Sequence, residues 1–158
     1  QVVESQWLSK SMGLNRFVSC QDEYNILNRN VEAELIPAMQ KYGCGLLPYF
    51  PLASGLLTGK YKRTEMPEGA RLTDMPTFAN RIYLTDENFD LVDNLNKFAK
   101  KTGHSILELA FGWMASRPTT ASIIAGATKP EQIEANVAAV NWVLSQSEID
   151  EVDKISAR

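Results

Sequence analysis

The segment SIIAGATKPEQIEANV near the C-terminus changes abruptly from apolar to polar, and its polar part could bind an anion. The apolar run stops at Gly126, and Thr128, Lys129, Gln132 and Asn136 follow it. An ammonium group can make charge-assisted hydrogen bonds to a phosphate group. We therefore interpret this segment as a candidate phosphate site.

The same segment contains the predicted start of a helix. Thr128 and Glu131 have the spacing of a capping box, and Pro130 suits the first helical turn. The free backbone N–H groups of such a helix start favour an anion. The alternative is that Thr128 only caps the helix and that Gln132 only faces water.

Other kinds of chemistry find little support in the sequence. The chain has one histidine and no CxxC pair, so we predict no metal site. We interpret His104 as a helix-entry residue, because it directly precedes a predicted cap at Ser105. LASGLL lacks the GxSxG pattern of a nucleophile elbow, and GLLTGKY has one residue too few for a phosphate loop. GCGLLP precedes a strand, whereas a dinucleotide fingerprint follows one.

Three short apolar runs predict the strands that must position these residues. They are RFVSCQ (16–21), CGLLPYF (44–50) and ASIIAGA (121–127). Because nearly every residue in them is apolar, we expect strands that are buried on both faces of a parallel sheet.

Helical patterns with clear end signals lie between and after these runs. NVEAELIPAMQKYG ends at Gly43, in the position of a left-handed cap, and contains Pro37 as a candidate kink. LTDENFDLVDNLNKFAKKTG is amphipathic and closes at Gly103. Ser105 and Glu108 predict a capping box, and the tail SQSEIDEVDKI carries a similar opening.

This alternation of strands and helices predicts an α/β protein with a parallel sheet. A closed eight-stranded barrel takes about 250 residues. A chain of 158 residues with three predicted strands can therefore hold only the last part of such a barrel, or a small open sheet. The segment from Leu52 to Thr85 is too long for an ordinary connection and is a candidate functional loop.

The carboxyl ends of the three predicted strands are all polar. Gln21, Asp22, Glu23 and Asn25 follow the first strand, YFPLASG follows the second, and GATKPEQ follows the third. Parallel α/β proteins bind ligands at this edge of the sheet. We therefore expect the three segments to contribute to one site.

Composition narrows the possible partners. The net charge of -3 and the absence of a basic block argue against a nucleic-acid partner. No apolar stretch reaches the roughly 20 residues that cross a bilayer, and the N-terminus lacks the pattern of a signal peptide. We predict a soluble, cytoplasmic protein without a membrane partner. The chain does not begin with Met, so we expect it to be a fragment.

The consecutive segments CQDEYNILNR, GLLPYFPLASGLLTGKY, PEGAR and SIIAGATKPEQIEANV resemble the C-terminal motifs of the aldo-keto reductases. They are most similar to the branch that includes bacterial reductases and potassium-channel β subunits. The resemblance implies the C-terminal part of an NADPH-dependent (β/α)8 TIM barrel over residues 1–158. It implies three parallel strands with helices, the N-terminal strands being absent from this chain.

The resemblance also implies how the nicotinamide end of NADPH is bound. Gln21 would hydrogen-bond the carboxamide, and the Tyr49 ring would stack on the nicotinamide. The run from Phe50 to Gly55, together with Lys60, would cross the pyrophosphate. This run departs from the family pattern at Phe50, where Ser or Trp is common, and at Ala53, where Gly is usual.

The adenosine end would be bound by a second group of residues. Arg71, Thr128, Lys129 and Gln132 would hold the 2′-phosphate, and Asn136 would contact the adenine. The full predicted set is Gln21, Tyr49, Phe50, Pro51, Leu52, Ser54, Gly55, Lys60, Arg71, Gly126, Thr128, Lys129, Gln132 and Asn136.

The family's catalytic Asp, Tyr, Lys and His would all lie upstream of residue 1, so we predict no catalytic residue in this chain. Tyr49, Lys60 and His104 belong to other motifs. The parent protein would reduce a small aldehyde or ketone by hydride transfer. The alternative is a non-catalytic module that binds a nucleotide or another protein, as in channel β subunits. We also expect the open strand edges to make the chain self-associate.

Overall fold

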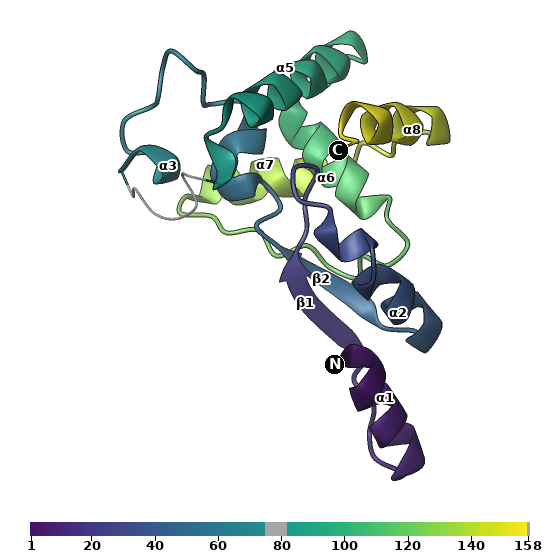
Figure 1. Ribbon diagram of the computed structural model, residues 1–158. Coiled ribbons are helices and arrows are strands. Elements are labelled where there is room, and N and C mark those ends of the chain that lie inside the picture. Colours follow the sequence, from purple (N-terminus) through teal and green to yellow (C-terminus); the bar gives the residue numbers. More distant parts are fainter. Residues whose placement is uncertain (75–81, 158) are drawn as a thin grey trace.

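The computed structural model describes residues 1–74 and 82–157, which form two strands and a series of helices. Strands β1 and β2 lie beside one another, helices α5, α6 and α8 lie above them in this view, and α1 projects from the amino ends of the strands (Figure 1). The elements are α1 (Val2–Ser11), β1 (Ser19–Glu23), η1 (Asn30–Glu32), α2 (Leu35–Tyr42), β2 (Gly45–Tyr49), η2 (Ala53–Thr58), α3 (Arg71–Asp74), α5 (Asp86–Lys101), α6 (Ile106–Ala115), α7 (Pro130–Ala139) and α8 (Gln146–Ile155).

The two strands are parallel, which confirms the predicted α/β class with a parallel sheet. Their register pairs Gln21 with Leu47 and Glu23 with Tyr49. The first strand was expected at 16–21, but it begins only at Ser19, where the ladder to Gly45 starts. The structure places Gln21 within this strand, so it does not follow the strand end as the sequence suggested.

The expectation that the strands are buried on both faces is wrong. Leu46 and Pro48 are buried in β2, whereas the alternating residues Gly45, Leu47 and Tyr49 are half-exposed. No residue of β1 is fully buried. Side chains of a strand alternate between the two faces of a sheet. One face therefore packs against the core, and the other carries Gln21, Glu23 and Tyr49.

The expected third strand at 121–127 forms only an irregular extension of the sheet. Leu46 N donates to Thr119 O at 2.6 Å, and Ala121 N donates to Leu46 O at 2.8 Å. Further along, Ile124 N donates to Pro48 O at 2.9 Å. Proline has no N–H to donate, so the ladder loses a bond there. Between these two hydrogen bonds β2 advances by two residues, from Leu46 to Pro48, whereas the third segment advances by three, from Ala121 to Ile124. One extra residue on one strand is the pattern of a β-bulge.

Gly45 allows this third segment to approach β2 closely. A Cβ atom at Gly45 would lie 2.6 Å from the Cβ of Ala121, closer than van der Waals contact permits. The segment 119–125 therefore runs in parallel beside β2 even though it lacks a regular ladder.

Most local helix signals are confirmed. Gly43 has φ 63° at the end of α2, and Gly103 has φ 82° after α5. Ser105 forms the expected capping box with Glu108. The tail also opens with a capping box, which lies at the start of α8. Pro37 does not kink a long helix, because it lies in the first turn of α2, after the separate short helix η1.

The capping box expected at the start of α7 does not form. Lys129 is the N-cap and Pro130 the first helical residue, so Thr128 lies one position before the cap. The Thr128 N–H and hydroxyl groups instead donate to the Gln132 side-chain oxygen at 2.7 and 3.2 Å. Gln132 thus takes the reciprocal role that Glu131 was expected to take.

The segment from Leu52 to Thr85, expected as one long loop, contains η2 and α3 in its described part. Residues 75–81 lie outside the described residues. Tyr61 connects the two short helices, because its hydroxyl group accepts a hydrogen bond from Leu72 N at 2.9 Å. Thr85 caps α5 through its side chain.

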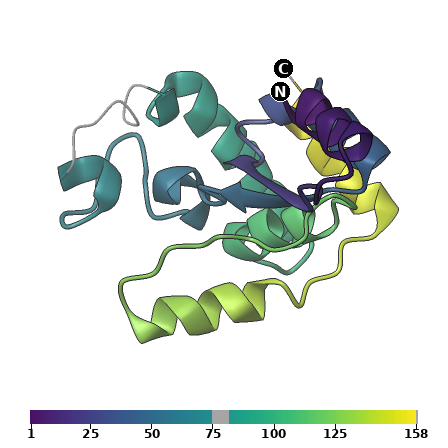
Figure 2. The ribbon, with the colours of Figure 1, turned by 90° about the horizontal axis from the view of Figure 1, so that it is seen from below.

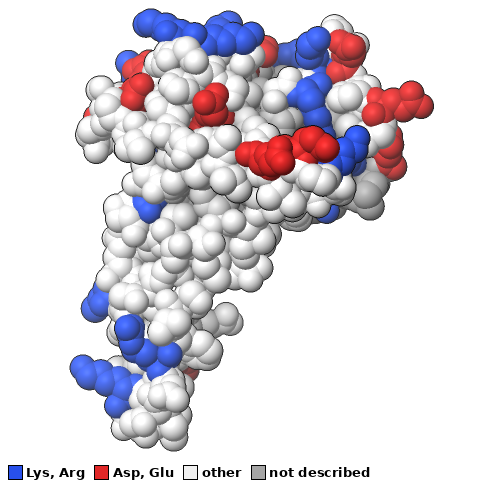
Figure 3. Space-filling view, turned by 180° about the vertical axis from the view of Figure 1, so that it is seen from behind, with Lys and Arg blue, Asp and Glu red and all other residues white. Residues whose placement is uncertain are grey.

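Apolar side chains are exposed around α1 and the strand edges. Trp7 is 60% exposed, Phe17 62% and Val18 66%. From behind, charged side chains lie mainly over the helical part and the α1 tip, with few of them between (Figure 3). No helix among the described residues is both long and apolar enough to cross a membrane.

Candidate functional site

The carboxyl ends of β1 and β2 define one end of the molecule. Gln21 and Tyr49 lie on the same face of the sheet, since Gln21 is paired with Leu47 and side chains two positions apart share a face. The short helices η2 and α3 and the start of α7 all lie at this end (Figure 2). The structure therefore places the three segments on one side of the protein, and that they form one site stays a prediction.

The connection that follows β2 has an unusual backbone. Phe50, Ala53 and Ser54 have φ values of 52°, 48° and 56°, and Gly55 has 97°. Each non-glycine residue in this left-handed region costs about 1–2 kcal/mol. Such strain clusters where the surrounding structure holds a segment for function. Within this segment Pro51, Ala53 and Ser54 are buried, and Leu52 is half-buried.

Asn25 fixes this connection to the end of β1. Its side chain is fully buried, and its Nδ2 donates to the Phe50 carbonyl oxygen at 3.0 Å. Its Oδ1 accepts hydrogen bonds from Leu27 N and Asn28 N, each at 2.9 Å. The sequence marked Asn25 only as a polar residue after a strand. The local signal for this turn was the residue type, because an Asn side chain commonly accepts hydrogen bonds from backbone N–H groups two or three residues further along the chain.

Lys60 lies against the backbone of η2. A Cβ atom at Gly55 would lie 3.2 Å from Lys60 Cε and 3.4 Å from its Nζ. The Lys60 ammonium also lies 5.1 Å from the centre of the Tyr61 ring, within the range of a cation–π contact. The lack of a side chain at Gly55 thus allows the exposed Lys60 chain to pack against η2.

Arg71 reaches the same region from α3. Its guanidinium carbon lies 5.6 Å from the centre of the Phe50 ring, and the Phe50 ring packs edge-on against Tyr49 at 5.2 Å. Arg71 is exposed and forms no ion pair within residues 1–74 and 82–157. Tyr49, Phe50 and Arg71 therefore form one contiguous group whose cationic end faces solvent.

The polar cluster at the start of α7 is built separately. Thr128, Lys129 and Gln132 are exposed, and Gly126 lies in the exposed approach to them. Asn136 lies one turn further along α7, where it lines a groove together with Val137 of α7, Ile123 of the segment before α7, and residues of α6. Where the structure describes the chain, no hydrogen bond or ion pair joins this cluster to Arg71 or Lys60.

His104 lies at the entry of α6, as expected. Its ring stacks on Trp142 with a centroid separation of 3.9 Å and an interplanar angle of 6°. Its Nδ1 lies 3.1 Å from Glu108 Oε1. The backbone and side chain of Ser105, followed by His104, hold the pKa of Glu108 below its ordinary value. These contacts give His104 a structural role at the helix entry.

The fold is that of a parallel α/β protein, a class that commonly binds ligands at the carboxyl edge of the sheet. In this chain the connections at that edge have a strained backbone and carry exposed cations. The model of the Aldo/keto reductase family matches residues 2–157. The chain therefore belongs to the aldo-keto reductase family, which confirms the resemblance drawn from its motifs.

Individual relatives include both channel-associated proteins and reductases. The chain is 38% identical over 161 residues to a probable voltage-gated potassium channel subunit beta of Oryza sativa subsp. japonica, covering 99% of this chain and 48% of that protein. It is 34% identical to L-glyceraldehyde 3-phosphate reductase of Escherichia coli (strain K12), covering 85% and 40%. It is 36% identical to NADH-specific methylglyoxal reductase of the same strain, covering 81% and 38%. The chain thus spans less than half the length of each of these relatives.

Proposed function

We propose that this chain is the NADP(H)-binding part of an aldo-keto reductase barrel, whose parent reduces small aldehydes or ketones. The observation that supports this most is the contiguous group of Tyr49, Phe50 and Arg71, which lies beside the Gly55–Lys60 contact at the carboxyl end of the sheet. A flat aromatic ring and two exposed cations suit a ligand that has a ring at one end and phosphates beyond it.

In this proposal different residues bind different parts of the cofactor. The Tyr49 ring would form a wall for the nicotinamide, with Gln21 on the same face of the sheet to bond its amide. The strained connection after β2 and Lys60 would meet the pyrophosphate. The cofactor itself supplies the hydride, and these side chains bind and orient it.

The adenosine end would be bound from two sides. Arg71 would reach the 2′-phosphate from α3, and Lys129 with the N–H groups at the start of α7 would reach it from the other side. A helix start and a guanidinium group are both suited to a phosphate dianion. The relative named NADH-specific shows that the family also includes proteins for the other cofactor. We propose NADPH here because Arg71 is exposed and forms no ion pair with the residues that the structure describes, so its charge can meet a phosphate.

Binding of the cofactor by this chain can be tested by titration. We expect NADPH to quench the tryptophan fluorescence of the 158-residue chain to saturation. We also expect 2′,5′-ADP, which carries the 2′-phosphate but no nicotinamide, to compete for the same site. An absence of any saturable signal from NADPH would contradict the proposal.

We predict that the chain alone does not reduce carbonyl compounds. Hydride transfer to a carbonyl needs a proton donor at the oxygen, and such a donor contributes roughly 10²–10⁴-fold. Of the described candidates, Lys60 contacts η2 and His104 stacks on Trp142. NADPH oxidation with a reactive aromatic aldehyde should therefore equal the protein-free blank. Turnover above the blank would show that an acid is present in this chain.

The same assay distinguishes the two candidate functions, a reductase and a non-catalytic module. Activity that appears only after a polypeptide with the remaining strands is added would show that the parent is a reductase. A cofactor that binds without turnover under those conditions would favour the alternative, a non-catalytic module similar to channel β subunits. In either case we propose a cytoplasmic location.

We further expect the isolated chain to self-associate. Trp7, Phe17 and Val18 expose apolar surface near the open edge of β1, and the segment 119–125 leaves a second open edge. Sedimentation should show dimers or larger species at concentrations on the order of tens of micromolar. A single monomeric species in that range would refute this expectation.

A further inference from the structure

Tyr83 connects the far end of the long segment after β2 to the end of β1. Its side chain is only 3% exposed, and its hydroxyl group donates a hydrogen bond to Glu23 Oε1. Burial and then the hydrogen bond to Glu23 raise the pKa of Tyr83, so the phenol stays protonated as a donor. No motif in the sequence pointed to this pair, which joins residues 60 positions apart.

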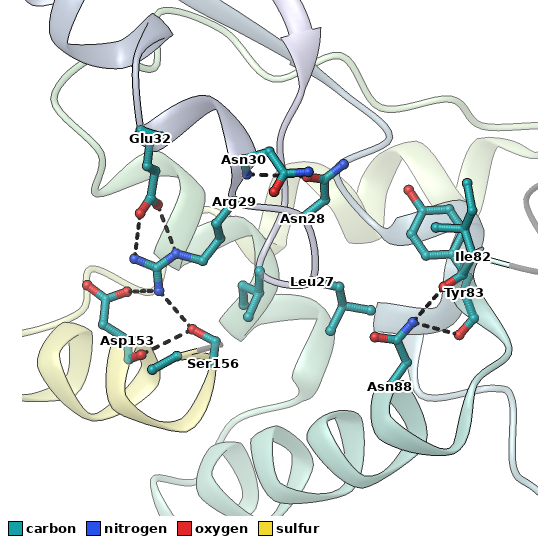
Figure 4. A pocket seen from close by; sticks show the side chains of 13 residues that line it. Leu27, Asn28, Arg29, Asn30, Glu32, Ile82, Tyr83, Asn88, Asp153 and Ser156 are labelled. Atoms are coloured by element: carbon teal, nitrogen blue, oxygen red, sulfur yellow. Dashed lines mark hydrogen bonds and ion pairs between the residues drawn. The ribbon is translucent and has the colours of Figure 1, made fainter.

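The backbone around Tyr83 is held as firmly as its side chain. Asn88, in the first turn of α5, donates through Nδ2 to Ile82 O at 2.9 Å and to Tyr83 O at 3.0 Å (Figure 4). The backbone N–H of Asn88 in turn donates to Thr85 Oγ1 at 3.2 Å. The start of α5 therefore positions Tyr83, and Tyr83 can transmit that position to the sheet.

Glu23 places this contact directly beside the candidate nicotinamide wall. Glu23 is the last residue of β1 and pairs with Tyr49, so the two side chains leave the same face of the sheet. The connection that begins after Tyr49 thus returns at Tyr83 to Glu23, which is the residue paired with Tyr49 in the sheet. The hydrogen bond closes this loop of chain at its base.

We propose that the Tyr83–Glu23 hydrogen bond is a clasp that holds the residues just before α5 against the end of β1 and so positions the Tyr49 ring for the nicotinamide. This inference rests on the proposed function. Tyr83 and Glu23 are positioning residues, since the cofactor would contact Tyr49. The clasp should affect the nicotinamide end more than the adenosine end, because Glu23 pairs directly with Tyr49, whereas the start of α7 lies outside the loop of chain that the clasp closes.

The variant Tyr83→Phe tests the clasp, since it removes one hydroxyl group and keeps the ring. The loss of a hydrogen bond to a charged group predicts NADPH binding about tenfold weaker. Binding of 2′,5′-ADP, which lacks the nicotinamide, should change less than about twofold. Glu23→Gln keeps a carbonyl acceptor and should fall between the wild-type chain and Tyr83→Phe. The matched control is Tyr42→Phe, whose hydroxyl group has no hydrogen bond within the described chain.

Limited proteolysis provides a readout that does not depend on the cofactor. Trypsin should cut after Arg71 faster in Tyr83→Phe than in Tyr42→Phe, because the loop has lost its attachment at the base. Unchanged cleavage would overturn the clasp. Equal weakening of NADPH and 2′,5′-ADP would overturn its role at the nicotinamide end. If the wild-type chain binds neither ligand, the proposed function and that role both fail, and cleavage alone decides whether the clasp exists.

Discussion

Replacing Arg71 with alanine should weaken the binding of NADPH by about 1.5–3 kcal/mol, the range for a hydrogen bond to a charged group. Binding of NADH should change little, because NADH has no 2′-phosphate for the guanidinium to meet. In the structure Arg71 lies over the Phe50 ring at 5.6 Å and forms no ion pair with other described residues. Its charge is therefore available to a ligand. Fluorescence titration with each cofactor measures the difference.

A suitable control is Arg63→Ala, which removes a cation of the same segment that is already engaged. Arg63 bonds Asp86 at 2.8 Å and Asp90 at 2.5 Å. This variant should leave the preference between the two cofactors unchanged. If Arg71→Ala weakens NADPH and NADH equally, Arg71 does not contact the 2′-phosphate.

The largest expected effect on stability lies at Asp153, at the C-terminal side of the fold (Figure 4). Its carboxylate accepts hydrogen bonds from Arg29 at 2.9 Å, from Arg117 at 2.5 and 3.1 Å, and from Trp113 Nε1 at 2.9 Å. Asp153→Asn should lower the free energy of unfolding by about 2–3 kcal/mol, because the half-buried Arg117 loses its ion-pair partner and Arg29 keeps only its pair with Glu32. Urea unfolding of both proteins measures the change. Asp150→Asn is the control, since Asp150 is exposed and contacts only Gln146 among the described residues.

The contribution of Asp153 should also depend on pH. Burial raises its pKa, but the hydrogen bonds and charges of Arg117, Trp113 and Arg29 outweigh burial and hold the pKa below the ordinary value of 3.8. A lowered pKa in the folded state means that the stabilisation is present above the unfolded-state pKa. It is lost as the pH falls through the folded-state pKa. The difference in stability between wild type and Asp153→Asn should therefore shrink below about pH 4. A difference that stays constant down to about pH 2 would show that folding does not lower the pKa of Asp153.

Features set by neighbouring residues could be predicted from the sequence. The capping boxes at Ser105 and Ser145 and the left-handed caps at Gly43 and Gly103 depend on contacts within a few residues, and all four are present. The parallel pairing of the first two strands followed from their apolar runs and the helix between them.

Features set by distant residues could not be predicted in this way. Pro48 interrupts the hydrogen-bond ladder between β2 and the third segment. This effect depends on which segment lies beside β2, and the sequence near Pro48 does not specify that neighbour. The start of α7 shifted by one residue because Pro130 fixes the first turn. The bond from Asn25 to Phe50 and the bond from Tyr83 to Glu23 join segments that are far apart in sequence, so no spacing rule marks these two contacts.

The central claim is that two separate groups of residues bind one cofactor molecule. Amide hydrogen exchange of the chain with and without NADPH tests this most directly. The account predicts slower exchange on binding in two places, residues 50–60 after β2 and residues 126–132 at the start of α7. With 2′,5′-ADP, we expect slower exchange at 126–132 and little change near Tyr49. Slower exchange in neither region, or in only one region with NADPH, would contradict a site formed by both.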